Sequence, residues 1–336
     1  MMFIPVVDKD QKPLMPTIPS RARRWIKTGR ATPFWKKGIF CIRLNEEPSG
    51  RKTQDIAVGI DPGSKKEAFT VKSEAHTYLN IQTDAVTWVK EAVKTRREMR
   101  RTRRSRKAPC RQPRYNRKKT RLVPSTRARW QWKIRILGWL SKMLPISWIV
   151  VEDIRARAKM GQGKWNASFS PLEVGKKWFY DQIRQKWPLS LYQGYETFRF
   201  RNELGLKKIK DKLSNRFEAH CVDSWTLAYQ GVGGNPIVDN RGILLITPLR
   251  FHRRQLHRFR PRKNGERSPY GGTRSMGFSR GSIVNHEQKG LVYIGGMPNG
   301  KISLHSIETG KRLYQYAQNK DIRFRCYSTW RTRRED

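Results

Sequence analysis

The chain has 336 residues, of which 72 are Lys or Arg and 27 are Asp or Glu, so its formal net charge is +45. So large an excess of positive charge is typical of proteins that bind nucleic acid, and a membrane-surface protein is the weaker alternative. No run of about 18 apolar residues is present, and Asp8 follows the short apolar start too closely for a signal peptide, so we expect a soluble, intracellular protein without a membrane partner.

The first 53 residues predict a small αβ module. Two apolar clusters flank a polar turn within Val6–Pro16, a short basic helix is expected over Arg21–Lys27, and a strand is expected over Ile39–Leu44. The module is either an accessory fold that covers a sheet edge or a clamp for nucleic acid. Its basic residues favour the clamp. The predicted contacts are Arg21, Arg23 and Arg24.

The stretch Ile56–Ser64 is the centre of the predicted fold. Its apolar run ends in Asp61, and a Pro-Gly turn follows, which predicts a buried strand that brings one carboxylate to the edge of a sheet. Alternating residues in Glu67–Val71 and His76–Ile81 predict two further strands. The hairpin and the added strand are the opening of a ribonuclease H-like α/β sheet.

Residues 90–135 contain 20 Lys or Arg and only two acids. Within them, Arg96–Lys107 has good helix formers with arginines at nearly every position, so a helix there would project arginine on all sides and could not lie in a core. A disordered basic tail is the alternative, but strands are predicted on both sides, which favours a helix surrounded by phosphates. The predicted contacts are Arg96, Arg97, Arg100, Arg101, Arg103, Arg104 and Arg106.

An amphipathic helix is expected next, over Ala128–Leu140, with Ile134, Leu137 and Leu140 packed on the sheet. Short β segments separated by glycine-rich turns dominate the chain after residue 237 and predict a small β module. These segments are Ile243–Thr247, Ser282–Val284, Leu291–Ile294 and Lys301–His305.

Two further apolar elements carry acidic residues that could lie beside Asp61. Trp148–Ile154 reads as a buried strand with Glu152 near its end, and Phe217–Ala228 has helical spacing with His220 and Asp223 on one face. Each acid alone could be an ordinary surface residue, but acids inside apolar elements of so basic a chain need a partner. Hard oxygen ligands suit magnesium or manganese. The predicted metal ligands are Asp61, Glu152 and Asp223.

The ordered set of motifs resembles one known family. Pro13–Pro16, Gly59–Gly63, the arginine-rich helix, Val151-Glu152 and His220-x-x-Asp223 are similar to the transposon-encoded IsrB proteins, relatives of IscB and of CRISPR type II effectors. The resemblance implies an RNA-guided DNA endonuclease with a split RuvC nuclease domain and a structured guide called omega RNA. It also implies that the three acids bind metal and that His220 is a catalytic histidine.

One departure from IscB is informative. In IscB an HNH nuclease lies between the second and third RuvC segments, whereas residues 155–214 contain no histidine here, and an HNH site needs histidine as base and metal ligand. We expect that this second nuclease is absent. The interval then reads as a linker with a helix or strand in contact with nucleic acid, and its tryptophans are equally consistent with core positions.

The resemblance implies the following divisions and contacts. The expected parts are a PLMP module (1–53), RuvC segment I (54–88), an arginine-rich bridge helix region (89–125), RuvC segment II (126–160), a linker or nucleic-acid contact segment (161–212), RuvC segment III (213–245) and a β-rich domain for RNA and the target-adjacent motif (246–336). The expected contacts in the last part are Arg253, Arg254, Arg258, Arg260, Tyr270 and Arg274.

The resulting hypothesis is a monomeric protein that works as a ribonucleoprotein in the prokaryotic cytoplasm, at the nucleoid when bound to DNA. It would hydrolyse phosphodiesters with two Mg²⁺ or Mn²⁺ ions, and His220 would orient or deprotonate the attacking water. With one nuclease site it would nick the non-target strand of duplex DNA that carries a short flanking motif. The alternatives are a guide-free RuvC-type junction resolvase and a non-catalytic RNA-binding scaffold.

Overall fold

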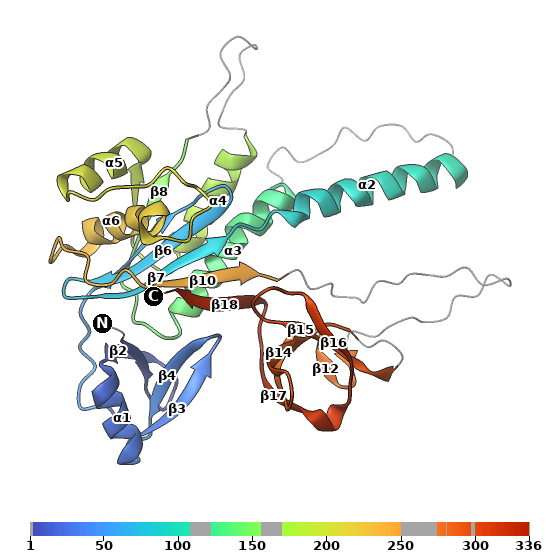
Figure 1. The fold of residues 1–336 in the computed structure, drawn as a ribbon. Helices are drawn as coiled ribbons and strands as arrows, with labels where there is room; N and C mark the ends of the chain where they lie inside the picture. Colours follow the sequence, from blue (N-terminus) through green and yellow to red (C-terminus); the bar gives the residue numbers. More distant parts are fainter. Residues whose placement is uncertain are drawn as a thin grey trace, which may run out of the picture. The chain divides into compact units, whose positions relative to one another are not determined.

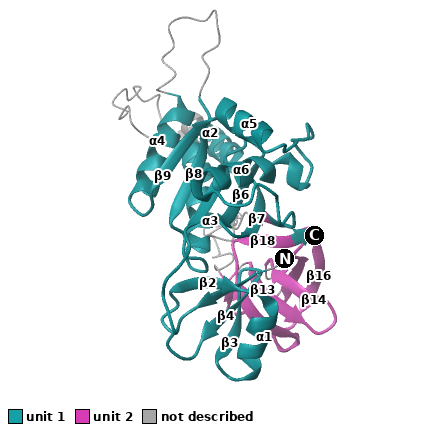
Figure 2. Ribbon diagram, turned by 90° about the vertical axis from the view of Figure 1, so that its left-hand side faces the viewer, with its two compact units in different colours: residues 1–245, 334–336 teal, residues 246–333 magenta. Residues whose placement is uncertain are grey.

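The computed structural model describes residues 3–107, 122–155, 170–249, 274–279, 281–296 and 300–335. The chain divides into two compact units, which are residues 1–245 with 334–336 and residues 246–333 (Figure 2). The first is mixed α/β, as predicted, and the second is built from strands. None of the described helices is both long enough and apolar enough to span a membrane.

A small four-stranded sheet with one helix forms the start of the first unit, in the order β2-β1-β4-β3 (Figure 1). The two apolar clusters form the antiparallel strands β1 and β2, and the predicted basic helix and last strand are confirmed. The strand between the helix and the last strand was not predicted. The helix exposes its arginines and buries Ala22 against Ile4 and Ile42. The elements are β1 (Ile4–Val7), β2 (Pro13–Thr17), α1 (Pro19–Lys27), β3 (Ala31–Lys36) and β4 (Ile39–Leu44).

The largest sheet has seven strands, in the order β18-β10-β7-β6-β5-β8-β9. The hairpin and third strand are antiparallel, whereas β5, β8 and β9 run parallel to one another. The predicted strands around Asp61 and Glu152 are therefore confirmed, and they are neighbours. The strands are β5 (Ile56–Asp61), β6 (Lys66–Ser73), β7 (Thr77–Asp84), β8 (Trp148–Asp153), β9 (Leu189–Gln193), β10 (Ile243–Pro248) and β18 (Trp330–Glu335).

Helix α6 (Cys221–Val232) covers one face of this sheet and contacts β5, β6 and β8. A Cβ atom on Gly59 in β5 would lie 1.9 Å from the backbone oxygen of Ser224 in α6, so only glycine permits this approach. The sequence predicted one helix from Phe217. The structure has instead a 3₁₀ turn, η2 (Phe217–Ala219), and His220 is the N-cap of α6 with φ −138°.

Helix α3 (Pro124–Leu140) covers the opposite face, where the Trp132 indole donates a hydrogen bond to Thr83 in β7. The predicted packing of Leu137 and Leu140 is confirmed, and both are buried. Ile134 is only half-buried. The residue that takes its place in the core is Ile136.

The arginine-rich helix is longer than predicted, α2 (Trp88–Lys107), and it projects from the sheet in Figure 1. The segment 161–212 contributes α4 (Pro171–Arg184), the sheet strand β9 and α5 (Gly194–Glu203), so its described part belongs to the α/β fold. The short strand β9 has no long apolar run of its own, and its pairing to β8 defines it.

The second unit has a five-stranded sheet in the order β16-β15-β14-β13-β17 around a core that includes Val284, Ile294 and Leu304. Three of the predicted β segments lie here. The segment from Ile243 was wrongly placed in this module, because it is strand β10 of the large sheet. The elements are β11 (Arg274–Ser275), β12 (Phe278–Ser279), β13 (Ser282–His286), β14 (Gly290–Ile294), β15 (Ile302–Ser306), β16 (Arg312–Ala317), η4 (Asn319–Asp321) and β17 (Ile322–Tyr327).

Candidate active site

The pleat of the sheet directs two of the predicted acids to the same face. Asp61 pairs with Ala68, which packs against Val222 and Trp225 of α6. Glu152 has the same orientation as Val150, two residues earlier, and the Val150 side chain lies against Gly231 of α6. Both carboxyl groups therefore lie on the face that α6 covers. Asp223 lies in the first turn of that helix.

Burial and mutual repulsion dominate the electrostatics of this cluster. Desolvation raises the pKa of Asp61, and the charge of Asp223 raises it further. Desolvation together with the neighbouring Asp61 raises the pKa of Glu152 to about 8, and a hydrogen bond between these two carboxyl groups adds to the shift. Glu152 is therefore the carboxyl that keeps a proton and donates it to Asp61 at neutral pH. The charge of Asp223 contributes to the raised pKa values of both Asp61 and Glu152, so the three acids form one site.

Two cationic side chains that were not predicted from the sequence bind the carboxylate of Asp223. Arg201 of α5 donates from Nη1 to Oδ1 at 2.5 Å. The Lys208 ammonium, from the segment after α5, donates to Oδ2. Both residues come from the stretch predicted to be a linker, and neither has a sequence spacing that connects it with an acid. Only the folded chain brings them to α6.

The donor set fits a divalent cation in chemistry and in charge. Carboxylate oxygens are the ligands that Mg²⁺ and Mn²⁺ prefer. Burial and then carboxylate repulsion raise the pKa values of Asp61 and Glu152, so a bound cation would favour the charged forms of both. Within the described ranges, however, no three His, Cys, Asp or Glu side chains are arranged so that together they could hold an ion. Both oxygens of Asp223 are engaged by cations of the chain instead.

His220 lies close to this cluster but not on the helical face that was predicted. It is 8% exposed, and its charge would lower the pKa of Asp61. Its Nε2 lies 3.1 Å from the backbone oxygen of Lys212. A carbonyl can only accept, so Nε2 carries the proton and Nδ1 is the ring nitrogen that can accept one.

A second buried ion pair lies on the opposite face of the sheet. The Lys133 ammonium of α3 donates to Oε1 of Glu67 at 2.6 Å, and both side chains are buried. One turn earlier on the helix, Arg129 donates to the backbone oxygens of Gly63 and Ser64, in the turn that follows Asp61. Helix α3 thus holds the turn in place without contributing to the carboxylate cluster.

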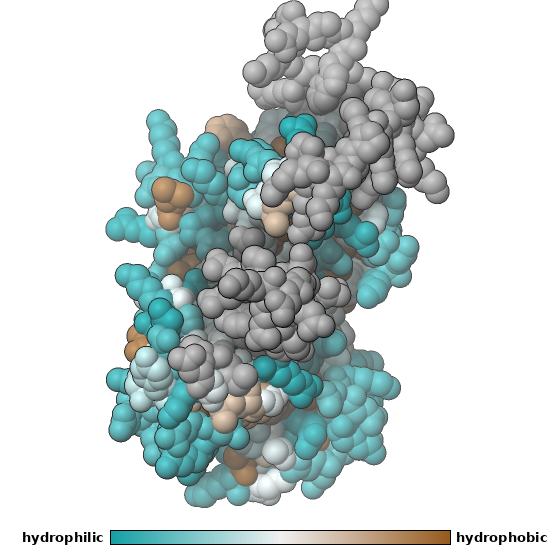
Figure 3. Space-filling view, turned by 90° about the vertical axis from the view of Figure 1, so that its right-hand side faces the viewer, coloured by the Kyte–Doolittle hydropathy of each residue, from teal (hydrophilic) through white to brown (hydrophobic). Residues whose placement is uncertain are grey.

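All of the predicted nucleic-acid contacts whose side chains are described are exposed arginines. The coloured residues of the face drawn in Figure 3 are largely hydrophilic. Arg103, Arg104 and Arg106 continue helix α2, but their side chains lie outside the described residues, as do all parts of Arg253, Arg254, Arg258, Arg260 and Tyr270. The exposed ones are Arg21, Arg23, Arg24, Arg96, Arg97, Arg100, Arg101 and Arg274.

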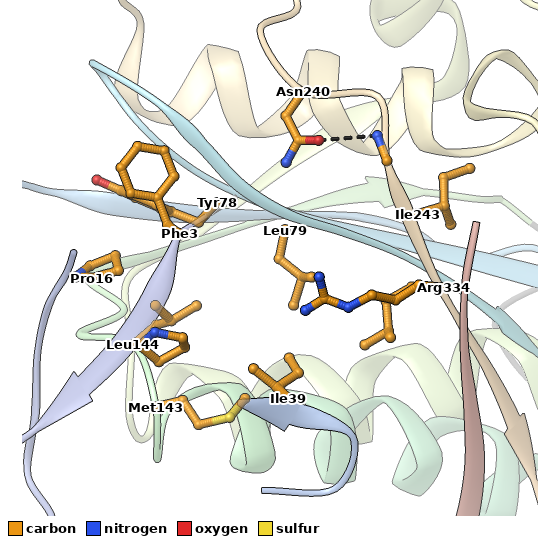
Figure 4. Close-up of a pocket in the computed structure, with 13 residues that line it drawn as sticks. Phe3, Pro16, Ile39, Tyr78, Leu79, Met143, Leu144, Asn240, Ile243 and Arg334 are labelled. Atoms are coloured by element: carbon orange, nitrogen blue, oxygen red, sulfur yellow. Dashed lines mark hydrogen bonds between the residues drawn. The ribbon is translucent and has the colours of Figure 1, made fainter. Parts of the chain in front are cut away.

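A cavity of about 280 Å³ in the first unit is separate from the carboxylate cluster (Figure 4). Its walls are mainly apolar, with side chains such as Phe3, Ile39 and Leu79. The Oδ1 atom of Asn240, also in its wall, accepts a hydrogen bond from the backbone of Gly242 at 3.0 Å. The cavity contains none of the predicted site residues and offers no nucleophile or acid–base pair.

Comparison with known proteins gives one family match and distant structural likenesses. A family model described as "RRXRR protein" matches residues 4–166, which include β5 and β8 and end before α6. T. thermophilus RuvC in complex with a Holliday junction substrate is similar at 12% identity and TM-score 0.29, over 54% of this chain and 97% of that one. The yeast mitochondrial Holliday junction resolvase Ydc2 is similar at 12% identity and TM-score 0.28, over 54% of this chain and 78% of its own. No curated protein matches.

Proposed function

We propose that the protein is a metal-dependent, RNA-guided DNA endonuclease that nicks the displaced strand of duplex DNA. The observation that carries the proposal is the cluster of Asp61, Glu152 and Asp223, drawn from two adjacent parallel strands and the helix that covers them. Such a cluster has little use in a protein that only binds RNA, because burying several acids together is costly. The match to the RRXRR family model agrees with the proposal.

The three acids would hold divalent metal, which supplies a polarised water and neutralises charge on the scissile phosphate. Burial and the neighbouring Asp61 raise the pKa of Glu152 to about 8, so Glu152 would have to lose its proton before both carboxyl groups can act as ligands. His220 would accept a proton at Nδ1, because Nε2 donates to the backbone of Lys212. Arg201 would keep the carboxylate of Asp223 oriented.

The exposed arginines would supply most of the affinity for nucleic acid. Guanidinium groups form paired hydrogen bonds with phosphate oxygens, and the arginines of α2 that can be described are all exposed. Contacts of this kind carry no sequence information. Choice of target would therefore rest on base pairing by a guide RNA and on recognition of a short flanking motif.

We expect cleavage of one strand because residues 155–214 contain no histidine that could serve a second, HNH-type site. The test is a supercoiled plasmid with the two strands labelled differently, incubated with the purified ribonucleoprotein and Mg²⁺. We expect open circles, with the cut in the non-target strand, and no cut with Asp61→Ala.

Three other outcomes would contradict the proposal in different ways. Linear product, or release of the target-strand label, would mean that the site reaches both strands. Cleavage of a four-way junction without RNA would support a resolvase. Tight binding of one RNA without cleavage of any DNA, under every metal condition, would support a scaffold.

A further inference from the structure

The two cations that hold Asp223 differ in how firmly they are placed. Arg201 lies on α5, its side chain is 11% exposed, and its guanidinium lies 5.3 Å from the ring centroid of Phe198. Helix α5 begins with a capping box between Gln193 and Glu196, which fixes its first turn. Removing Arg201 from Asp223 would leave a buried guanidinium without its carboxylate. Arg201 is therefore costly to separate from Oδ1.

Lys208 can leave Asp223 at much lower cost. Its side chain is 34% exposed, and it lies in the segment between α5 and η2, outside any helix or strand. A lysine has a flexible four-carbon stem, so its ammonium can move to water while the stem stays in place. The hydrogen bond to Oδ2 is therefore the exchangeable one.

The charge of Lys208 acts on the whole cluster. Burial alone would lower the pKa of Lys208, but the charges of Asp61, Asp223 and Glu152 outweigh it and raise that pKa. Lys208 is also the charge that most opposes the rise in the pKa of Asp61. Lys208 therefore supplies the three acids with positive charge, as a bound metal ion would.

We propose that Lys208 is a displaceable counter-ion of the carboxylate cluster. A divalent metal ion and the Lys208 ammonium would compete for Oδ2 of Asp223, while Arg201 keeps Oδ1. This inference rests on the proposed function, because it assumes that the cluster binds metal. Lys208 is a positioning residue in this account, and it sets how much metal the site needs before the three acids can act together.

The test is calorimetric titration of MnCl₂ into the full chain, purified free of nucleic acid, without any cleavage assay. Lys208→Met should bind Mn²⁺ roughly ten-fold more tightly than the unmodified protein, the effect expected for one ammonium a few ångströms from a divalent ion in water-like screening. Lys208→Gln should do the same, and it serves if the methionine variant does not fold. Lys208→Arg, which keeps the charge, and Lys207→Met, an exposed neighbour, should bind as the unmodified protein does.

A second measurement separates competition from a purely structural role. Without metal, Lys208→Met should melt at a lower temperature than the unmodified protein, and saturating Mn²⁺ should raise its melting temperature by more. Unchanged or weaker Mn²⁺ binding by the Met and Gln variants, with binding still abolished in Asp61→Ala, would overturn the role of Lys208 and leave the proposed nuclease standing. Absence of saturable Mn²⁺ binding in every variant, the unmodified protein included, would overturn the metal-dependent nuclease itself, and the role of Lys208 with it.

Discussion

Replacing Lys133 by methionine should destabilise the fold by about 3–5 kcal/mol, because it leaves the Glu67 carboxylate buried without its cation. Nζ of Lys133 lies 2.6 Å from Oε1 of Glu67, and the exposed fractions of the two side chains are 2% and 0%. Oε2 of Glu67 has no hydrogen-bond partner among the described residues, so the carboxylate already depends on Lys133. Solvent cannot take the place of the missing ammonium at this depth.

The double variant Lys133→Met with Glu67→Met should recover most of the stability, because it replaces a buried ion pair by apolar side chains of similar size. Chemical unfolding in urea, followed by far-UV circular dichroism, measures both values. Arg135→Met on the exposed side of the same helix is the matched control and should stay within about 0.5 kcal/mol.

The single variant should also acquire a pH dependence. Burial raises the pKa of Glu67, and without Lys133 the protonated form is favoured further. Between the pKa of Glu67 in the unfolded chain and its raised pKa in the folded chain, the folded state binds more protons than the unfolded state, so the stability of Lys133→Met rises as the pH falls through this range. A destabilisation below about 1 kcal/mol, or a double variant whose destabilisation equals the sum of the two singles, would refute this account of the pair.

Three other predictions follow from the geometry. Gly59→Ala should lower the free energy of unfolding by about 3 kcal/mol or more, because its Cβ would meet the backbone of α6. Gly138→Ala in α3 has open space around it, so it should leave the stability unchanged or raise it by up to about 1 kcal/mol. Thermal melts of the two variants test this difference. The pKa of Glu152 is raised from 4.5 to about 8, so stability should fall as the pH rises through that range, by at most about 5 kcal/mol. The stability of Glu152→Gln should not fall over this pH range, so this variant should be more stable than the unmodified protein above about pH 8. Equal slopes of stability against pH for the variant and the unmodified protein would refute the raised pKa of Glu152. Replacing Arg100 and Arg101 by glutamine should lower the slope of log affinity for RNA against log salt by about one for each phosphate that is no longer neutralised, and an unchanged slope would make α2 a solvated connector.

The parts of the fold that were predicted are those with a local signal. The apolar run that ends in Asp61 and the run that carries Glu152 are strands in the structure, because buried parallel strands have continuous apolar sequences. Leu189–Gln193 has no such signal, because it is short and all five of its residues are only half-buried, and its pairing to β8 decides its structure. Arg312–Ala317 was missed for a similar reason, because most of its side chains are exposed.

The candidate site was predicted in part for a related reason. An acid at the end of an apolar element stands out in the sequence, so the three carboxylates could be found before their contacts were known. Arg201 and Lys208 could not, because the chain contains 72 Lys and Arg and the two are separated from Asp223 by 22 and 15 positions. Their role depends on how α5 packs beside α6.

The close approach of Gly59 to α6 bears on how such a site can change over evolutionary time. Strand β5 and helix α6 meet there through main-chain atoms, with no side chain between them. Core side chains elsewhere can be exchanged for others of different volume, and the elements shift slightly in response. At this crossing no side chain sets the spacing, so sequence drift in the core has little effect on it. Asp61 lies two residues beyond Gly59 on the strand, and Asp223 is next to Ser224 on the helix. The main-chain contact between Gly59 and Ser224 therefore fixes the distance between these two acids.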